Sequence, residues 1–183
     1  IGTGRSAVEL ARARVAVTGV DLSAPMLSGL EQRLAAEPAE VRRRVRAVRG
    51  DMRTVRLRKR FPLVIAVFNT VLHLPTRSDM EQFLARVRGH LAAGGRFVFD
   101  FSVPQADYLG ADPERRYGAP RFRHPSRGVV RYGERCDYDA MRQVLHMRLE
   151  FSPEDGSSPW ADPLTHRQFC AQGMEALLHD NGF

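Results

Sequence analysis

Short apolar runs alternate with segments of helical periodicity along the first hundred residues. Four runs have the length and composition of buried strands: residues 15–20, 45–48, 61–68 and 96–101. Apolar side chains recur at helical spacing in three segments between or before them: residues 6–14, 23–37 and 78–93. Strands that alternate with helices in this way predict an α/β fold with a doubly wound, mostly parallel sheet.

Local signals predict where these helices begin and end. Ser23 is suited to an N-cap, because Pro25 follows in the first turn, and Glu37-Pro38 is expected to end that helix. Ser78-x-x-Glu81 has the form of a capping box, and Gly94-Gly95 is expected to stop the helix that it opens.

The pattern changes after residue 101. Residues 102–128 contain four prolines and three glycines, which predicts a loop-rich segment. Three further strands and a last helix are expected at residues 129–138, 143–151, 164–170 and 172–180. We therefore predict a small antiparallel insertion at 102–170 between a core at 1–101 and a final core helix at 171–183.

A glycine turn at the start of the chain and two later acids point to a nucleoside ligand. Gly2 and Gly4 allow a tight backbone turn, and the helix that follows directs its free N–H groups toward that turn. Asp21 ends the next strand seventeen residues after Gly4, a position from which a carboxylate accepts hydrogen bonds from ribose hydroxyls. Asp51 follows the run at 45–48 and suits the exocyclic amine of an adenine.

The turn alone leaves two other interpretations open. It also fits the dinucleotide fingerprint G-x-G-x-x-A, and a glycine turn can occur in a sheet protein without any ligand. A short-chain dehydrogenase would need a Tyr-x-x-x-Lys pair, but the only lysine is Lys59.

Five motifs in register resemble class I S-adenosylmethionine-dependent methyltransferases. They are Gly2-Thr3-Gly4-Arg5, Val20-Asp21-Leu22-Ser23-Ala24-Pro25-Met26-Leu27, Gly50-Asp51-Met52-Arg53, Val64-Ile65-Ala66-Val67-Phe68-Asn69 and His90-Leu91-Ala92-Ala93-Gly94-Gly95-Arg96-Phe97. Together they cover residues 1 to about 101 in the family's order. The resemblance implies a Rossmann-like sheet and S-adenosylmethionine as the cofactor.

The resemblance also implies which residues bind this cofactor. In the family, the glycine turn contacts the methionine part, the first acid holds the ribose, and the residue after it packs beside the adenosine. The second acid and the backbone of the next residue recognise the adenine edge. The end of the family's fourth strand borders the sulfonium and the methionine amine. The matching positions are Gly2, Thr3, Gly4, Asp21, Leu22, Asp51, Met52, Phe68 and Asn69.

The family pattern extends beyond both ends of this chain. It has an acid and a further glycine just before Ile1, at the end of a first strand, and two more strands after Phe183. We therefore expect a truncated or incompletely represented protein that lacks the first strand and the last hairpin.

Composition and charge narrow the class of protein. The 43% hydrophobic content of the 183 residues allows a single core, and no apolar run approaches the length of a membrane span. Cys136 and Cys170 form neither a disulfide framework nor a metal site by their spacing, so a reduced, cytoplasmic protein is expected. The net charge of +7 is of the sign that favours binding to nucleic acid. We disfavour it, because 27 arginines against one lysine indicate a coding bias.

The sequence lacks the residues that several other kinds of methyl transfer require. The loop after the run at 61–68 reads Asn69-Thr70-Val71-Leu72, where methylases of DNA amino groups carry (Asp/Asn)-Pro-Pro-(Tyr/Phe). Neither cysteine follows a proline, as the nucleophile of pyrimidine C5 methylases usually does, and no acid cluster for a catalytic metal follows Phe68.

Direct displacement remains, in which the protein aligns the acceptor and removes a proton. His73, five residues past Phe68, is the candidate base, because histidine titrates near neutral pH. The alternative roles are packing of its loop or lining of the cofactor. His166 and Arg167 lie on opposite faces of their strand, so either could reach into the acceptor pocket, but we expect solvent exposure for both.

The predicted function is methyl transfer to a small-molecule acceptor. Nitrogen is favoured over oxygen as the methylated atom, because the insertion resembles that of N-methyltransferases of amino sugars and of glycine. The alternatives are an RNA methyltransferase, favoured by charge alone, and a cofactor-binding protein without transfer activity. The sequence identifies neither the acceptor nor the oligomeric state.

Overall fold

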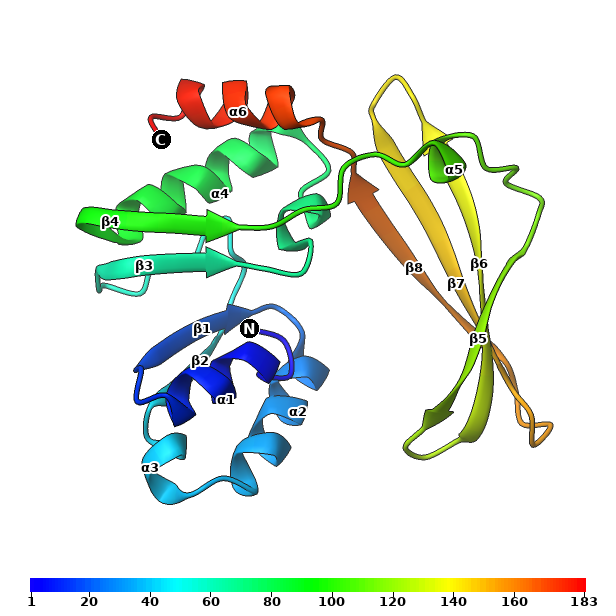
Figure 1. Cartoon of the computed structure of the whole chain (residues 1–183), viewed down its shortest axis with the longest axis horizontal. Helices are drawn as coiled ribbons and strands as arrows, with labels where there is room; N and C mark the ends of the chain where they lie inside the picture. The colour runs from blue at the N-terminus through cyan, green and yellow to red at the C-terminus, as the bar shows by residue number, and fades with distance from the viewer. The chain divides into compact units, whose positions relative to one another are not determined.

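The computed structural model describes residues 1–183, except for the side chain of residue 119. The chain folds as two units. The first unit comprises residues 1–60 and 82–90, and the second comprises residues 61–81 and 91–183. Figure 1 shows the helices and strands of both units. Within the described residues, no helix is both long enough and apolar enough to cross a membrane.

In the first unit, two parallel strands pack against helices. β1 (Val17–Asp21) pairs in parallel with β2 (Val45–Arg49). Three helices contact this pair or one another: α1 (Arg5–Arg12), α2 (Ala24–Ala35) and α3 (Ala39–Arg42) (Figure 1). Their apolar sides close a core of Val8, Ala11 and Val41, against which Leu34 and Val45 pack. Burial of this apolar surface stabilises the amphipathic helices that the sequence predicts.

The ends of α1 and α2 follow from local chemistry. Gly4 precedes α1 with φ of +80°, and a Cβ placed on it would lie 2.2 Å from a methyl carbon of Leu30. Glycine is therefore required there both by backbone conformation and by space. The predicted N-cap of α2 is confirmed, because the Ser23 hydroxyl accepts the N–H of Met26 at 3.3 Å.

The second unit begins with another parallel pair. β3 (Phe61–Ala66) pairs with β4 (Leu91–Phe99), and the 3-10 helix η1 (Thr70–His73) and the start of α4 (Arg77–His90) follow β3. The predicted capping box at Ser78 and Glu81 is wrong. Thr76 caps α4 instead: its hydroxyl accepts the Asp79 N–H at 3.0 Å and donates to the Asp79 carboxylate at 2.6 Å.

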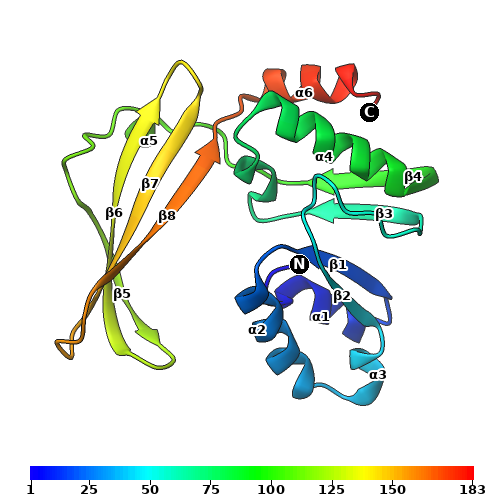
Figure 2. The ribbon, with the colours of Figure 1, turned by 180° about the vertical axis from the view of Figure 1, so that it is seen from behind.

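Four antiparallel strands form a second sheet in this unit (Figure 2). In sheet order they are β5 (Tyr117–His124), β6 (Gly128–Asp139), β7 (Val144–Pro153) and β8 (Trp160–Arg167). The short helix α5 (Ala106–Leu109) contacts β6, and α6 (Ala171–Asp180) follows β8. The loop-rich segment predicted at 102–128 also contains α5 and β5, neither of which was predicted.

Strand register sorts the side chains of this sheet onto two faces, because directly paired residues project to the same side. Alternate residues of β6 (Tyr132, Glu134, Cys136 and Tyr138) share one face with His166 of β8, which pairs through Leu145 with Tyr138. We call this the Glu134 face. The opposite side, here the Glu150 face, carries Glu150 together with Arg131, Arg135 and Arg148.

The predicted α/β class and the parallel pairing are confirmed. The parallel strands form two pairs, one in each unit, and the antiparallel sheet follows β4 along the chain. The expected division of the chain at residues 101 and 170, and the expected lack of a first strand and a last hairpin, stay predictions.

Candidate functional site

The glycine turn of the first unit is bonded to the end of β1. The N–H of Gly2 donates to Oδ2 of Asp21 at 2.7 Å, and the N–H of Ser23 donates to Oδ1 at 2.9 Å. One carboxylate thus holds the turn and also the start of α2. Burial alone would raise the pKa of Asp21, but the N–H groups of Ser23 and Gly2 stabilise the charged form and keep its pKa below the ordinary value.

The remaining predicted residues of this unit surround the ends of β1 and β2. Leu22 follows Asp21 with 63% of its surface exposed, which leaves an apolar side chain free to pack against a ligand. Thr3 lies in the turn, and its carbonyl accepts a bond from Arg33 at 3.1 Å. Met52 follows Asp51 in the turn after β2.

Asp51 is engaged by a neighbour that the sequence analysis missed. The guanidinium of Arg53 donates to both carboxylate oxygens, at 2.6 to 3.1 Å, and the N–H of Arg53 donates to Oδ1 at 2.8 Å. The hydrogen bonds from Arg53 hold the pKa of Asp51 below its ordinary value. A ligand that binds the Asp51 carboxylate must therefore share that carboxylate with Arg53.

In the second unit, two successive residues after β3 adopt left-handed backbone conformations. Phe68 has φ of +60° and Asn69 has φ of +59°, which is uncommon for residues with a side chain. The N–H of Asn69 donates to Asp100 at 2.9 Å, and its side-chain oxygen accepts the N–H of Ser102 at 2.7 Å. Such conformations cluster at functional sites, and here they leave the Phe68 ring 59% exposed.

Asp100 and Ser102 are site residues that the sequence analysis did not single out. Asp100 directly follows β4, just as Asp21 ends β1. The rule that identified Asp21, an acid at the carboxyl end of a parallel strand, would have identified Asp100 as well.

His73 contacts a second histidine. It ends η1, which packs on β8, and its ring lies 4.8 Å from the ring of His166 in an edge-to-face arrangement with an interplanar angle of 78°. Among the described residues, neither ring nitrogen of His73 is hydrogen-bonded to the protein. Loss of solvent around the ring lowers the pKa of His73 from its ordinary value near 6.5. His73 is therefore neutral at pH 7 and able to accept a proton.

The expected exposure of His166 and Arg167 is wrong. His166 is half-buried. Burial of its ring, and to a smaller extent the charge of a protonated His73, lowers the pKa of His166 to about 4. Arg167 donates to backbone carbonyls of Pro75 and Arg142 and to the side chain of Gln143, and its buried Nε has no hydrogen-bond partner among the described residues. Both side chains thus belong to the contact between β8 and the segment of η1.

We expect His166 to make the stability of the protein depend on pH. Its pKa is about 6.5 when unfolded and about 4 when folded, so below pH 6.5 the unfolded state binds more protons. The free energy of unfolding should therefore fall as the pH drops from about 6.5 toward 4. Urea unfolding at pH 7.5 and 5.0 measures this. The variant His166→Gln should show a smaller difference, whereas the exposed His146→Gln should match the natural chain; equal differences in all three would contradict the assignment.

A small pocket lies on the Glu134 face of the second unit. It has a volume of about 240 Å³, and its lining includes Tyr108, Tyr117, Glu134 and the buried Cys136. The Tyr132 hydroxyl donates to Glu134 at 2.6 Å. This pocket was not predicted, because Tyr108 and Glu134 are brought together by the packing of α5 on β6.

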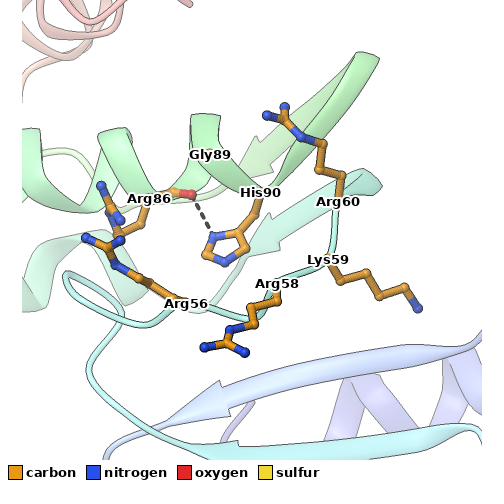
Figure 3. A pocket seen from close by; sticks show the side chains of 7 residues that line it. All are labelled: Arg56, Arg58, Lys59, Arg60, Arg86, Gly89 and His90. Atoms are coloured by element: carbon orange, nitrogen blue, oxygen red, sulfur yellow. Dashed lines mark hydrogen bonds between the residues drawn. The ribbon is translucent and has the colours of Figure 1, made fainter.

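A second pocket, in the first unit, is basic (Figure 3). It measures about 370 Å³ and is lined by Arg56, Arg58, Lys59, Arg60, Arg86, Gly89 and His90. Nε2 of His90 accepts the N–H of Leu57 at 3.0 Å, and Nδ1 lies 2.7 Å from the carbonyl of Arg86, to which it must donate. Both ring nitrogens are thus used to fix the segment before β3 to the end of α4, which is a structural role.

Comparisons with known proteins relate the chain to methyltransferases. A family model described as a methyltransferase domain matches residues 1–95. A curated relative from Streptomyces venezuelae, dTDP-3-amino-3,4,6-trideoxy-alpha-D-glucopyranose N,N-dimethyltransferase, is 30% identical over 121 residues. The match covers 64% of this chain and 48% of that protein, so the chain spans about half the length of this relative.

Solved structures share the fold over nearly the whole chain. The CcbJ methyltransferase from Streptomyces caelestis is 26% identical with a TM-score of 0.84, covering 99% of this chain and 69% of that one. DesVI from Streptomyces venezuelae is 23% identical with a TM-score of 0.76, covering 99% and 72%. CalS10, an amino pentose methyltransferase from Micromonospora echinaspora solved with S-adenosylmethionine bound, is 24% identical with a TM-score of 0.72, covering 99% and 71%.

Proposed function

Because the chain belongs to the methyltransferase-domain family, as its motifs predict, we propose that it transfers a methyl group from S-adenosylmethionine to a nitrogen of a small-molecule acceptor. The observation that carries this proposal is the glycine turn bonded to the Asp21 carboxylate at 2.7 Å, directly before helix α1. A turn of this kind presents backbone N–H groups and one fixed acid to a nucleoside ligand.

The residues of the first unit fit such a cofactor. A Cβ placed on Gly2 would meet no atom within 4 Å, so the turn is open on that side to a ligand. Oδ1 of Asp21 accepts one backbone N–H, from Ser23, and keeps a lone pair for a ribose hydroxyl. We assign Thr3 and Gly4 to the methionine part, Leu22 to the adenosine face, and Asp51 with the Met52 backbone to the adenine edge.

Phe68 and Asn69 complete the proposed cofactor residues. The exposed Phe68 ring offers a π face to the sulfonium cation, an attraction that aromatic rings give to cations generally. The Asn69 side-chain oxygen is already bonded to Ser102, so its amide nitrogen is the group left for a ligand.

His73 is proposed as the general base. When bound, S-adenosylmethionine supplies a methyl group whose bond to sulfur breaks with the electron pair left on sulfur. The acceptor needs a neutral amine, so an ammonium acceptor first gives one proton to the neutral imidazole of His73. The amine lone pair then forms the new C–N bond, and His73 passes its proton to solvent. His166 limits the movement of His73 by packing against its ring.

The small-molecule acceptor is supported by the relatives, two of which are named as acting on an amino-deoxy sugar nucleotide and on an amino pentose. A test uses the full-length protein, methyl-labelled S-adenosylmethionine and two acceptor pools, total RNA and a small-metabolite extract. Label in the metabolite pool is expected. Label in RNA would replace the small-molecule assignment by the RNA alternative, and bound cofactor without label in any of a widened panel of acceptors would identify a non-catalytic binder.

A further inference from the structure

Glu134 is a half-buried carboxylate surrounded by hydroxyl groups. The Tyr132 hydroxyl donates to it at 2.6 Å, and the pocket that it lines also contains Tyr108 and Tyr117. Among the described side chains, no arginine, lysine or histidine forms an ion pair with Glu134. A carboxylate withdrawn from water without a counter-ion is costly to the fold.

The Glu150 face of the same sheet shows the opposite arrangement. There, Glu150 lies within 3.0 to 3.5 Å of the guanidinium groups of Arg116, Arg135 and Arg148. Glu154, at the end of β7, is likewise paired with Arg121 and Arg131 at 3.0 and 2.8 Å. In a chain with 28 basic and 21 acidic residues, a half-buried carboxylate without a cation partner stands out.

The chemistry of the pocket favours a small cation as its ligand. Besides Glu134, its lining contains the Asp107 carboxylate and no basic side chain. The Glu134 charge raises the pKa of Tyr108, and burial with the bond to Glu134 raises the pKa of Tyr132, so both tyrosines remain neutral. Cys136, only 1% exposed, places an uncharged thiol in the same lining, because burial raises its pKa. The pocket therefore carries negative charge and neutral hydroxyls.

Strand register places this pocket on the same face as the histidine pair. His166 projects from the Glu134 face, level with Tyr138 of β6, and contacts His73. Glu134 lies four residues before Tyr138, which corresponds to about 13 Å along the strand at ~3.3 Å per residue. A group held by Glu134 is therefore separate from the nitrogen that His73 would deprotonate.

We propose that Glu134, with Tyr108 and Tyr132, binds an ammonium group of the acceptor that is distinct from the nitrogen receiving the methyl group. This inference rests on the proposed function, because it assigns the pocket to the acceptor. An ammonium supplies the missing counter-ion, and its N–H groups donate to Glu134 and to the tyrosine oxygens. The same charge repels a phosphorylated group, so the acceptor at this position is cationic and not a nucleoside diphosphate.

Binding of two matched sugars tests the site without requiring turnover. Glucosamine carries an ammonium group at pH 7, whereas N-acetylglucosamine is uncharged. Titrations followed by NMR on the full chain should show tighter binding of glucosamine, and Glu134→Gln should weaken that binding at least tenfold. Glutamine retains an oxygen that accepts the Tyr132 hydroxyl, so the sheet should stay intact, and thermal unfolding checks this.

Glu175→Gln is the matched control, because Glu175 is exposed on α6 outside the pocket. It should bind glucosamine like the natural chain. Equal affinity for the two sugars, or no effect of Glu134→Gln, would overturn the ammonium site. With an acceptor found by the labelling assay, Glu134→Gln should raise KM about tenfold and leave kcat within about twofold, the pattern of a binding residue. Failure of the proposed function would instead appear as absent label with glucosamine binding retained.

Discussion

Replacing His73 with alanine is expected to lower the rate of methyl transfer about 100-fold, because general-base catalysis contributes roughly 10²–10⁴-fold. The His73 pKa lies below 6.5, so the base is already neutral at physiological pH. Cofactor affinity should not change, since the ring of His73 contacts His166 and is assigned no bond to the cofactor. Single-turnover measurements with saturating cofactor isolate the transfer step.

The pH profile adds a second readout for His73. Transfer by the natural chain should fall as the pH drops through the His73 pKa, below about 6.5, because the imidazolium cannot accept a proton. The His73→Ala profile should lack this decline. His146→Ala removes an exposed histidine from the Glu150 face and serves as the control. A single-turnover rate that is unaltered in His73→Ala would return His73 to a packing role.

Replacing Asp21 with alanine is expected to weaken cofactor binding 10- to 100-fold, which corresponds to about 1–3 kcal/mol for charged hydrogen bonds. The proposed ribose bonds would be lost, and the N–H groups of Gly2 and Ser23 would lose their shared acceptor. The turn would then be free to move, so the cofactor would also have to order it on binding. Calorimetric titration with S-adenosylmethionine measures the change.

Two further variants separate charge from geometry at this position. Asp21→Asn keeps one carbonyl oxygen for a backbone N–H and should bind the cofactor with intermediate affinity. Glu31→Ala removes an equal charge from the exposed side of α2 and should leave the affinity unchanged. If Asp21→Ala bound the cofactor as tightly as the natural chain, the ribose assignment would be wrong.

Features set by near neighbours in the sequence were predictable. The glycine turn, the acid at the end of β1 and the Ser23 cap depend on spacing within some twenty residues, and the structure contains all three. The parallel pairing was predictable because each apolar run is separated from the next by a helical segment or long connection.

Proline concealed β5 and the first part of β8, whose second part overlaps the strand predicted at 164–170. Pro120 lies in β5 and Pro163 in β8, and both strands lie at an edge of the antiparallel sheet, where a missing N–H can face away from the ladder. Gly94-Gly95 was likewise misinterpreted as a helix stop. β4 already begins at Leu91, and its register shifts around these glycines, where a Cβ on Gly95 would lie 3.0 Å from the Phe61 carbonyl.

Contacts between distant segments could not be predicted from local patterns. His73 and His166 are 93 residues apart, and their contact depends on how η1 packs on β8. The isolation of Glu134 from arginine depends on a register that sends every other β6 residue to the opposite face. The Arg53–Asp51 ion pair is different: it joins residues two apart and could have been considered from the sequence.

Asn69 gives the second unit a mechanical property. Its N–H is bonded to Asp100 and its side chain to the N–H of Ser102, so the loops after β3 and β4 are fastened together at two points. A displacement of one loop must carry the other along or break both bonds. Binding and release of a ligand at this edge would then require the two loops to move together. Both loops would open at the same rate.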